Sequence, residues 1–307
     1  MDLTRSFDVV ALGEAMVEFN QTRAGEPQYL QDFGGDTSNA VIAAARAGAC
    51  TAYLTRLGQD TFGDALMALW QREGVDTSGV ERDPSAPTGI YFVTHGPKGH
   101  EFSYRRAGSA ASRMTPQWLP RGLVRAAGIL HVSGISLAIS ASARDTAFAA
   151  MNEARGAGTL VSFDPNLRLK LWPLEEARAA IERAIGACDL FLPSAEDAAV
   201  LSGHSDPHAI ADWGHGLGAR QVVLKLGADG ALVSDGQRRE QIDGHRVAIV
   251  DATGAGDCFC GNLLARLALG DSIFAAARYA NAAAAIAVQG FGAVAPLPRP
   301  DQVRALL

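Results

Sequence analysis

The sequence has few cysteines and no long hydrophobic run. Four of its 307 residues are cysteine, and their spacing matches no zinc-binding pattern, so buried, reduced thiols are expected. No uncharged apolar stretch reaches the roughly 18 residues of a membrane-spanning helix. Residues 1–8 carry acidic side chains and lead directly into an apolar segment, unlike a secretory signal peptide. These features predict a soluble, cytoplasmic protein.

An excess of positive charge is also missing. Lys and Arg number 27 and Asp and Glu number 33, which gives a formal net charge of −6. A mildly acidic protein has no overall attraction for nucleic acid or for an anionic membrane, so we expect neither as a partner. Any anion that it binds must meet local positive groups. Hydrophobic residues make up 48% of the chain, which is enough to form a sizeable core.

Short apolar segments alternate with amphipathic or Ala-rich segments along most of the chain. Continuous apolar segments predict buried parallel strands, and the segments between them predict helices on both faces of the sheet. Strands are predicted at 9–12, 51–55, 129–132, 160–164, 190–192, 221–225 and 247–250, and helices at 39–48, 62–73, 142–155, 174–185, 255–269 and 273–288. The pattern predicts an α/β fold: a single three-layer α/β/α, doubly wound domain over residues 1–307 with a mostly parallel sheet.

Two segments interrupt this alternation. Residues 16–19 and the polar residues up to 31 are typical of a hairpin or lid piece, and the segments 90–94 and 101–105, joined by a turn at 96–99, predict a β-hairpin. We expect the two excursions, at about 14–36 and 87–112, to form a small β-sheet lid. Exposed strand edges in such a lid favour pairing between two copies, so a homodimer through the lid is expected.

The most informative segment runs from Val247 to Asp257. An apolar segment leads into the run DATGAGD, after which Phe259, Leu263 and Leu267 have the spacing of a helix packed on a core. The two glycines allow a ligand to approach the backbone, and the free N–H groups at the start of the helix form an anion site. Asp257 fits two interpretations, an ordinary acidic residue at a helix N-terminus or a general base beside a phosphate.

Two common nucleotide-binding motifs do not fit this turn. The third glycine of a G-x-G-x-x-G dinucleotide motif is replaced by Phe259, and the sequence has no G-K-[ST] of a P-loop. A dinucleotide-dependent oxidoreductase is therefore disfavoured. From the residues alone, phosphoryl transfer with Asp257 as the base and a simple anion-binding turn are equally good interpretations.

Five motifs, in the same order, resemble those of the ribokinase-like (phosphofructokinase B) sugar kinases. They are GGDTSN at 34–39, GQDTFGD at 58–64, GVD at 74–76, KLGADG at 225–230 and DATGAGD at 251–257. Together they span nearly the whole chain. The resemblance implies a ribokinase-like fold and the ATP-dependent transfer of phosphate to a sugar hydroxyl.

The resemblance also implies roles for individual residues. The amides of Gly254, Ala255 and Gly256 would form the anion hole for the transferred phosphate, and Asp257 would deprotonate the acceptor hydroxyl. ATP would be bound by the glycines of this turn and by residues of neighbouring segments, namely Asn166, Ser194, Lys225, Gly227, Gly230 and Asn281.

Cations are implied in the same way. The family usually has Asn and, three residues later, Glu near the magnesium ion, where this chain has Ser194 and Asp197 with Glu196 beside them. Mg²⁺ is expected as the partner of ATP, with Asp197 reaching it through water. Asp251 is a candidate for a monovalent-cation site, which the sequence leaves open.

Two arginines near the expected binding edge favour an acidic sugar. Within the family the chain is most similar to 2-keto-3-deoxygluconate kinases, in segments that include 89–91, 102–106 and 164–168. A 2-keto acid has a carboxylate, which guanidinium groups bind well. Neighbouring residues of a strand point to opposite faces, and Arg105 rather than Arg106 is predicted to face the substrate. The predicted substrate-binding residues are Gly34, Gly35, Asp36, Asn39, Tyr91, Tyr104, Arg105, Arg168 and Asp257.

The expected acceptor is therefore the terminal 6-hydroxyl of 2-keto-3-deoxygluconate. Glu18 stands where many hexose kinases of the family have an aspartate, which disfavours fructokinase without excluding it. A fructokinase, ribokinase or nucleoside kinase remains an alternative, as does a non-catalytic sugar-binding regulator, although a binding protein has no use for a base. His204, His208 and His215 are expected in a surface loop, because Pro207 interrupts a helix and the spacing is not that of a zinc site.

Overall fold

A ten-stranded sheet forms the centre of the part of the chain that the computed structural model describes, residues 5–96 and 99–307. Its order is β14-β13-β12-β11-β10-β9-β1-β4-β5, and β6 also pairs with β4. The strands from β4 to β12 are parallel, and β13 and β14 add an antiparallel edge. The bounds are β1 (Phe7–Leu12), β4 (Thr51–Gly58), β5 (Val75–Asp76), β6 (Val80–Asp83), β9 (Ala127–Ser133), β10 (Leu160–Asp164), β11 (Leu190–Phe191), β12 (Gln221–Lys225), β13 (Ala231–Ser234) and β14 (Arg239–Ile242).

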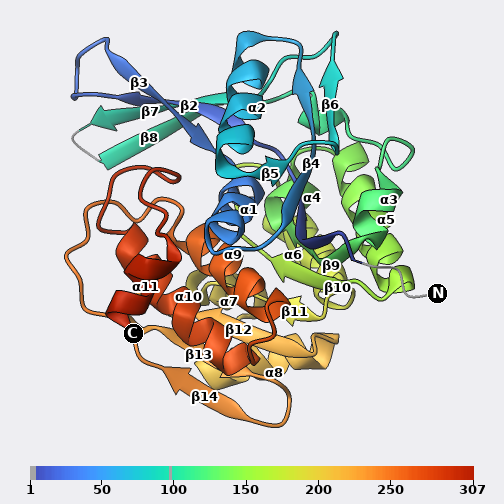
Figure 1. Cartoon of the computed structure of the whole chain (residues 1–307), viewed down its shortest axis with the longest axis vertical. Coiled ribbons are helices and arrows are strands. Elements are labelled where there is room, and N and C mark those ends of the chain that lie inside the picture. The colour runs from blue at the N-terminus through green and yellow to red at the C-terminus, as the bar shows by residue number, and fades with distance from the viewer. Residues whose placement is uncertain (1–4, 97–98) are drawn as a thin grey trace.

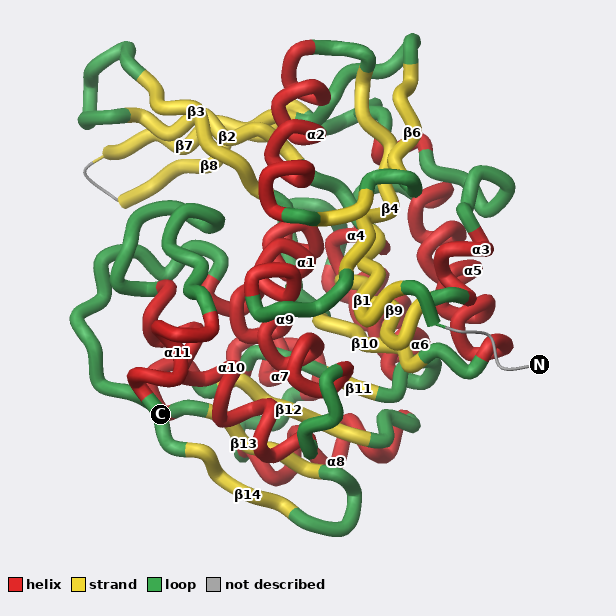
Figure 2. Tube along the Cα trace, in the orientation of Figure 1, coloured by secondary structure: helices red, strands yellow, loops and turns green. Residues whose placement is uncertain are grey.

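Helices cover both faces of this sheet, as the sequence predicted (Figures 1 and 2). In β1, Val10 and Leu12 pack in the core of one face and Val9 and Ala11 in the cores of the other, which explains why residues 9–12 are all apolar. One face carries α1 (Asp36–Arg46), α2 (Thr61–Glu73), α9 (Ala255–Ala268), α10 (Ile273–Ala287) and α11 (Pro300–Leu306). The other carries α3 (Arg121–Arg125), α4 (Gly134–Ala138), α5 (Ala141–Ala157), α6 (Leu174–Ile185), α7 (Ala195–Ser202) and α8 (Pro207–Leu217).

A second, four-stranded sheet projects from one end of the molecule (Figure 1). Its order is β3-β2-β7-β8, with β2 and β7 parallel and both outer pairs antiparallel. Phe19 and Phe92 stack at 5.3 Å between ring centroids, and Tyr29 meets Phe92 edge-on at 5.7 Å. We call this sheet the lid; its strands are β2 (Met16–Gln21), β3 (Tyr29–Gly34), β7 (Ile90–Gly96) and β8 (Gly99–Arg105). Pro97 and Lys98, which belong to the predicted turn, lie outside the described residues. So do residues 1–4, which belong to the segment predicted not to be a signal peptide.

Two local predictions are wrong. The segment 247–250 is not a strand. The sheet ends at β14, and the segment does not pair with it; Ile249 and Val250 are 65% and 60% exposed. Pro207 does not interrupt a helix but begins α8, where a missing N–H costs nothing and the side chain of Asp206 caps the first turn. His208 and His215 therefore lie on a helix rather than in a loop.

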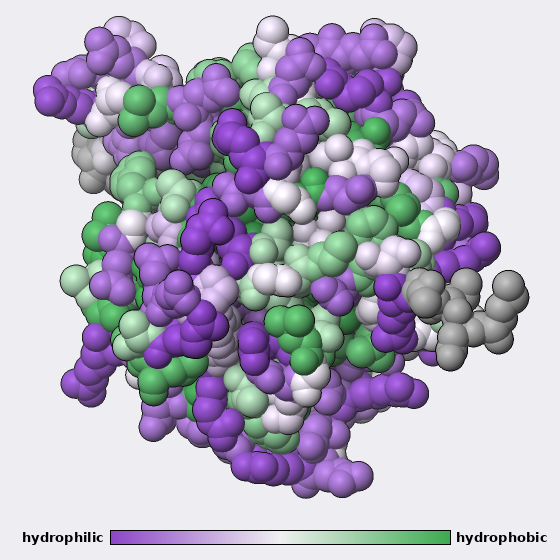
Figure 3. Space-filling model, in the orientation of Figure 1, coloured by the Kyte–Doolittle hydropathy of each residue, from purple (hydrophilic) through white to green (hydrophobic). Residues whose placement is uncertain are grey.

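The surface on the side shown in Figure 3 is mostly hydrophilic, with apolar side chains scattered among the polar ones. Hydrophilic residues gather at the tip of the lid and along the edge of the sheet farthest from it. Among the described residues, no helix combines the length and the apolar character that a membrane crossing requires.

His215 bonds the carbonyl of Ala219 and the hydroxyl of Ser234, so its role is structural.

Candidate active site

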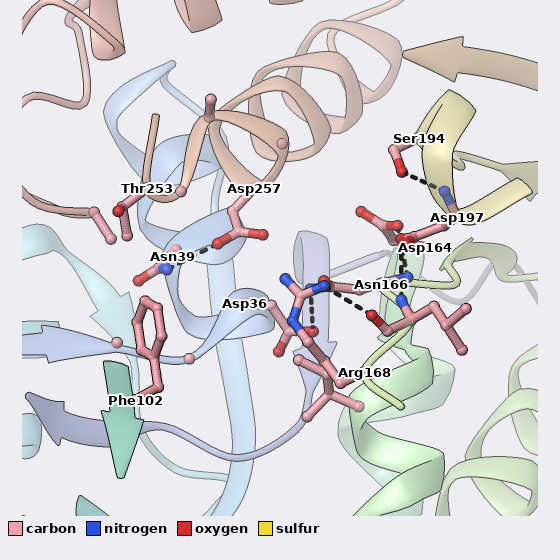
Figure 4. A pocket seen from close by; sticks show the side chains of 18 of the residues that line it. Asp36, Asn39, Phe102, Asp164, Asn166, Arg168, Ser194, Asp197, Thr253 and Asp257 are labelled. Carbon is pink, nitrogen blue, oxygen red and sulfur yellow. Dashed lines mark hydrogen bonds between the residues drawn. The ribbon is translucent and has the colours of Figure 1, made fainter. Parts of the chain in front are cut away.

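A cavity of about 760 Å³ lies between the lid and the carboxyl ends of the central strands (Figure 4). β1 lies between β4 and β9 in the sheet. The strands that follow β1 in the sequence are therefore added first on one side of it and later on the other, and β1 is a topological switch point. Ligands of open α/β sheets bind at such a switch. The wall is formed by residues that follow β1, β10, β11 and β12, by lid residues and by the start of α9.

The N-terminus of α9 forms one part of this wall. Gly254 has φ 74°, and a side chain there would press against Ala293, so the position requires glycine. Asp251 holds the turn, because its carboxylate accepts from the N–H of Thr253 at 2.9 Å and from that of Gly292 at 3.0 Å. The N–H of Ala255 donates to the carbonyl of Ala252 at 3.2 Å. The helix thus begins with a fixed turn that opens onto the cavity.

The next two amides of α9 are available to an anion. Within the described residues, the N–H groups of Gly256 and Asp257 meet no hydrogen-bond acceptor. Residues 254–257 all line the cavity. The prediction named the amides of Gly254, Ala255 and Gly256. Of these, the amide of Ala255 closes the preceding turn, whereas those of Gly254 and Gly256 meet no acceptor in the described part of the chain.

Asp257 lies in the first turn of α9 and faces α1 (Figure 4). Its Oδ2 accepts a hydrogen bond of 2.9 Å from Nδ2 of Asn39. Burial raises the pKa of Asp257 to about 7, and the negative charges of Asp36 and Asp164 add to this, while the Asn39 bond and the charge of Lys225 act in the opposite direction. The carboxyl group therefore titrates near neutral pH, which suits proton transfer.

Two more carboxylates lie close to Asp257. Asp36, the first residue of α1, is buried and accepts from Nδ2 of Asn166 at 2.9 Å. Asp164, the last residue of β10, accepts from the N–H of Asn166 at 3.1 Å and from Nζ of Lys225 at 2.5 Å. Asn166 has φ 32°, a conformation that asparagine tolerates better than most residues. It therefore links the loop after β10 to the start of α1.

The start of α7 forms another part of the wall. The hydroxyl of Ser194 accepts from the N–H of Asp197 at 3.1 Å and caps the helix. Oδ2 of Asp197 accepts from the N–H of Leu167 at 3.0 Å, and burial raises the pKa of Asp197. Glu196 is exposed and also lines the cavity. Ser194 thus serves the helix, and the two carboxylates remain as oxygen ligands at this end of the site.

The lid contributes a row of side chains on one face of β8. Tyr104 pairs with Tyr91 of β7, and their rings stack at 5.6 Å between centroids. Phe102, Tyr104 and Arg106 all line the cavity, because alternate residues share one face of a strand. Arg105 does not line the cavity; it is exposed, and its guanidinium donates to the carbonyl of Tyr104 at 3.1 Å. The predicted choice of Arg105 over Arg106 as the cavity-facing arginine is therefore wrong.

Glu14 is a site residue that sequence reasoning missed. It follows β1, its side chain is fully buried, and it lines the cavity. Its carboxylate pairs with Arg106, with Nε at 2.7 Å, and accepts from the hydroxyl of Ser109 at 2.5 Å. A signal was present in the sequence: Glu14 stands at the carboxyl end of the first strand, next to the switch point, where ligands bind.

Glu18, in contrast, does not line the cavity. It lies on β2, is buried, and accepts hydrogen bonds from the hydroxyl of Tyr91 and, at 2.9 Å, from Nδ2 of Asn20. Burial raises its pKa, although these two bonds oppose the change. Tyr91 lies against Gly34, where a Cβ would come within 2.3 Å of its hydroxyl. Glu18 therefore holds Tyr91 in place.

The structure places most of the other predicted residues in the cavity wall, including Gly34, Gly35, Gly227 and Arg168. Two predicted ATP-binding residues are elsewhere. Gly230 has φ 91° and is packed against the carbonyl of Ile242, so its role is in the β12–β13 turn. Asn281 is buried in α10 and donates to the carbonyl of Asp243 at 2.7 Å. Neither reaches the cavity.

Known proteins resemble the chain over nearly its whole length. A family model described as pfkB family carbohydrate kinase matches residues 6–300. The 2-dehydro-3-deoxygluconokinase of Bacillus subtilis (strain 168) is 34% identical over 308 residues, which cover 98% of this chain and 95% of that protein. The enzyme of the same name from Thermoproteus tenax is 36% identical, with 97% and 94% covered. Probable fructokinase-4 of Arabidopsis thaliana is 33% identical, with 97% and 95% covered.

Solved structures show the same fold. The crystal structure of a PfkB protein from Polaromonas sp. JS666 superposes with a TM-score of 0.90 at 33% identity and covers 98% of this chain and 100% of its own. The fructokinase of Xylella fastidiosa, solved with bound ATP, has a TM-score of 0.90 at 26% identity and covers 97% of this chain and 98% of its own.

Proposed function

Because the chain belongs to the pfkB family of carbohydrate kinases, we propose that it transfers the γ-phosphate of ATP to the terminal 6-hydroxyl of 2-keto-3-deoxygluconate, also called 2-dehydro-3-deoxygluconate. Membership of the family makes the chain an ATP-dependent sugar phosphotransferase. The acceptor is the part that is proposed. Two curated relatives named 2-dehydro-3-deoxygluconokinase, 34% and 36% identical to the chain, support it.

The observation that carries the proposed acceptor is the pair of guanidinium groups in the cavity wall. Arg106 comes from the end of the lid and Arg168 from the loop after β10. Glu14 contacts Nε and Nη2 of Arg106, and within the described residues its Nη1 meets no protein acceptor. A carboxylate that enters between the two arginines would receive N–H donors from both. A neutral sugar would offer these donors only uncharged oxygen acceptors, which bind guanidinium groups more weakly than a carboxylate does.

The residues at the start of α9 account for the chemistry. In the proposed reaction, Asp257 removes the proton of the acceptor hydroxyl as its oxygen attacks the γ-phosphorus. Asn39 holds Oδ2 of Asp257, and Oδ1 meets no protein partner in the described part of the chain. One carboxylate oxygen is thus fixed and the other is left for the substrate. The N–H groups of Gly256 and Asp257 would stabilise the negative charge on the phosphate.

The wall near α7 fits a magnesium ion that is bound mainly by ATP. Asp197 and Glu196 offer carboxylate oxygens there, which Mg²⁺ prefers. No cluster of three His, Cys, Asp or Glu ligands occurs in residues 5–96 and 99–307, so a cage made of protein side chains is not available for a metal ion. Asp197 and Glu196 would hold the ion through its water molecules. Magnesium bound to ATP would neutralise part of the phosphate charge.

A second acceptor, fructose, is favoured by the fructokinases among the relatives, such as that of Arabidopsis thaliana at 33% identity. The geometry gives this alternative less support. Glu18, at the position where a hexose kinase would have an aspartate for sugar hydroxyls, is bonded to Tyr91 and Asn20 instead of facing the cavity.

The test is ADP release with Mg-ATP over a panel of 2-keto-3-deoxygluconate, its galactonate epimer, fructose, ribose and adenosine. We expect the two keto acids to give the highest kcat/KM. The proposed acceptor is wrong if fructose, ribose or adenosine exceeds both acids. Reduction of the acid carboxylate to an alcohol gives a matched control substrate with the same hydroxyls. It should lose at least about tenfold in kcat/KM if the arginines bind the carboxylate, which corresponds to about 1.4 kcal/mol.

A further inference from the structure

Lys225 is a buried cation in the wall of the cavity. It is the last residue of β12, and its Nζ donates to Oδ2 of Asp164 at 2.5 Å and lies 3.5 Å from Sγ of Cys260. Burial lowers the pKa of this ammonium group and is the largest single cause, but the negative charges around the group and its hydrogen bond to Asp164 together outweigh burial, so the pKa of Lys225 is raised. The side chain is therefore positively charged at neutral pH.

The ammonium group lies beside the start of α9. A Cβ built on Gly256 would be 3.5 Å from Nζ of Lys225. The ammonium and the two unpaired N–H groups of Gly256 and Asp257 thus share one part of the wall. The sequence has only two other lysines. Of these, Lys170 lies at the exposed rim of the cavity, so Lys225 is distinguished by burial as well as by position.

A phosphate at the start of α9 needs a positive charge nearby. Asp36, Asp164 and Asp257 all line the cavity, and the first two raise the pKa of the third, so the local field is negative. The partial charge of a helix N-terminus amounts to about half an elementary charge. It cannot balance three carboxylates and a phosphate. Lys225 supplies the full positive charge that this part of the wall otherwise lacks.

We propose that Lys225 is a catalytic residue that contacts a non-bridging oxygen of the transferred phosphoryl group; this deepens the proposed kinase reaction and rests on it. In that reaction the bond between the γ-phosphorus and the β,γ-bridging oxygen breaks, and ADP leaves with the electron pair. A bond forms between the acceptor oxygen and the phosphorus, and Asp257 takes the proton. Lys225 neither gains nor loses a proton. It stabilises the charge on the phosphoryl oxygens as the transfer proceeds.

The other hydrogen bonds of Asp164 allow Lys225 to turn from Asp164 towards a phosphate. Its Oδ1 accepts from the N–H of Asn166 at 3.1 Å, and its Oδ2 accepts from the thiol of Cys260 at 3.3 Å. Burial raises the pKa of Cys260 well above the ordinary value, so the thiol stays protonated and remains a donor. Asp164 therefore keeps two hydrogen bonds when the ammonium turns towards a phosphate, which lowers the cost of that movement.

The experiment compares nucleotide affinities by calorimetry, with Mg²⁺ and without an acceptor. A non-hydrolysable ATP analogue that has a γ-phosphate and ADP, which lacks one, are titrated into the wild type and Lys225→Met. The wild type should prefer the analogue, and Lys225→Met should lose that preference by about tenfold or more, with kcat lower by about a hundredfold, the effect of removing one charge-stabilising donor. Arg220→Met, which removes an exposed cation outside the cavity, should keep the wild-type ratio of affinities.

A second variant guards against a folding defect. Lys225→Met leaves Asp164 without its ion-pair partner, and an unpaired buried charge destabilises a protein. The double variant Lys225→Met/Asp164→Asn removes both charges and should fold with the same loss of preference for the analogue. Lys225→Arg keeps the charge and should retain a preference for the analogue. An unchanged ratio of affinities in a folded variant that lacks the lysine would overturn the inference.

The outcome is separable from that of the acceptor test. If the wild type released ADP with no member of the sugar panel, the proposed acceptor would fail, but the ratio of affinities would still decide whether Lys225 contacts the γ-phosphate. If 2-keto-3-deoxygluconate were the acceptor and Lys225→Met kept both the ratio and kcat, the role of Lys225 would be rejected while the acceptor stood.

Discussion

Replacing Asp257 by asparagine should abolish turnover and stabilise the protein at the same time. The substitution keeps the shape of the side chain and keeps an oxygen that can accept the hydrogen bond from Asn39. It removes the base, so kcat should fall by about 10³-fold or more, near the upper part of the range for general-base catalysis. It also removes a negative charge beside Asp36 and Asp164, which should preserve or improve the affinity for ATP.

The gain in stability depends on pH, and its sign follows from the position of the proton. Between the ordinary pKa of 3.8 and the raised pKa of about 7, the folded protein holds a proton on Asp257 that the unfolded chain has lost. The free energy of unfolding of the wild type therefore falls as the pH rises through this range. The Asp257→Asn variant has no carboxyl group at this position, so its free energy of unfolding does not fall in this way. At about 1.4 kcal/mol per pKa unit, its advantage should grow by roughly 1–3 kcal/mol from pH 5 to pH 7 and stay constant above.

The assay is denaturant unfolding of the nucleotide-free protein at pH 5 and pH 8, together with ADP release. Asp301→Asn is a matched control, because Asp301 has a side chain that is 93% exposed and lies on α11 outside the cavity. It should change neither turnover nor the pH dependence. An advantage of Asp257→Asn that is equal at both pH values would show that the carboxyl group is not destabilised by burial. Near-normal turnover would remove Asp257 from the role of base.

Two further expectations concern the same cavity. Arg106→Lys keeps a positive charge beside Glu14 but loses the planar guanidinium group, so KM for 2-keto-3-deoxygluconate should rise about tenfold or more. Arg105→Lys should leave this KM unchanged. Equal effects of the two substitutions would contradict the assignment of Arg106 as the cavity-facing arginine. Asn39→Ala removes a bond that lowers the pKa of Asp257, so the fall of kcat/KM on the acidic side of the pH profile should move to higher pH; an unmoved limb would contradict a positioning role for Asn39.

The central sheet was predictable because its strands are buried on both faces. β1, β9 and β12 are buried at most of their positions and contain short apolar segments, and such segments alternating with helices are typical of a parallel sheet covered on both sides. The segment 247–250 has the same composition but no strand beside it to pair with, so its apolar side chains are exposed. Composition alone does not contain this information, because pairing depends on where the rest of the sheet ends.

The site was predictable where a motif fixes the backbone and less so where tertiary contacts choose between neighbours. The turn before α9 requires glycine at 254, where φ is 74°, and its residues line the cavity. The choice between Arg105 and Arg106 depends on which face of β8 meets the cavity, and the aromatic residues at 102 and 104 could have decided it by alternation. Glu14 belongs to no expected motif; its position after the first strand was a signal, but its pairing with Arg106 depends on how the lid folds.

The order of the strands has a consequence for the synthesis of the protein. The cavity wall contains residues from Glu14 to Ala293, and α10, which ends at Ala287, packs on α9 and on the face of the sheet that carries α1. A ribosome must therefore release almost the entire chain before the base and the start of α9 can take their places. A chain that ends before α9 has the lid but lacks the base and the anion-binding amides, so it does not have a complete site for phosphoryl transfer.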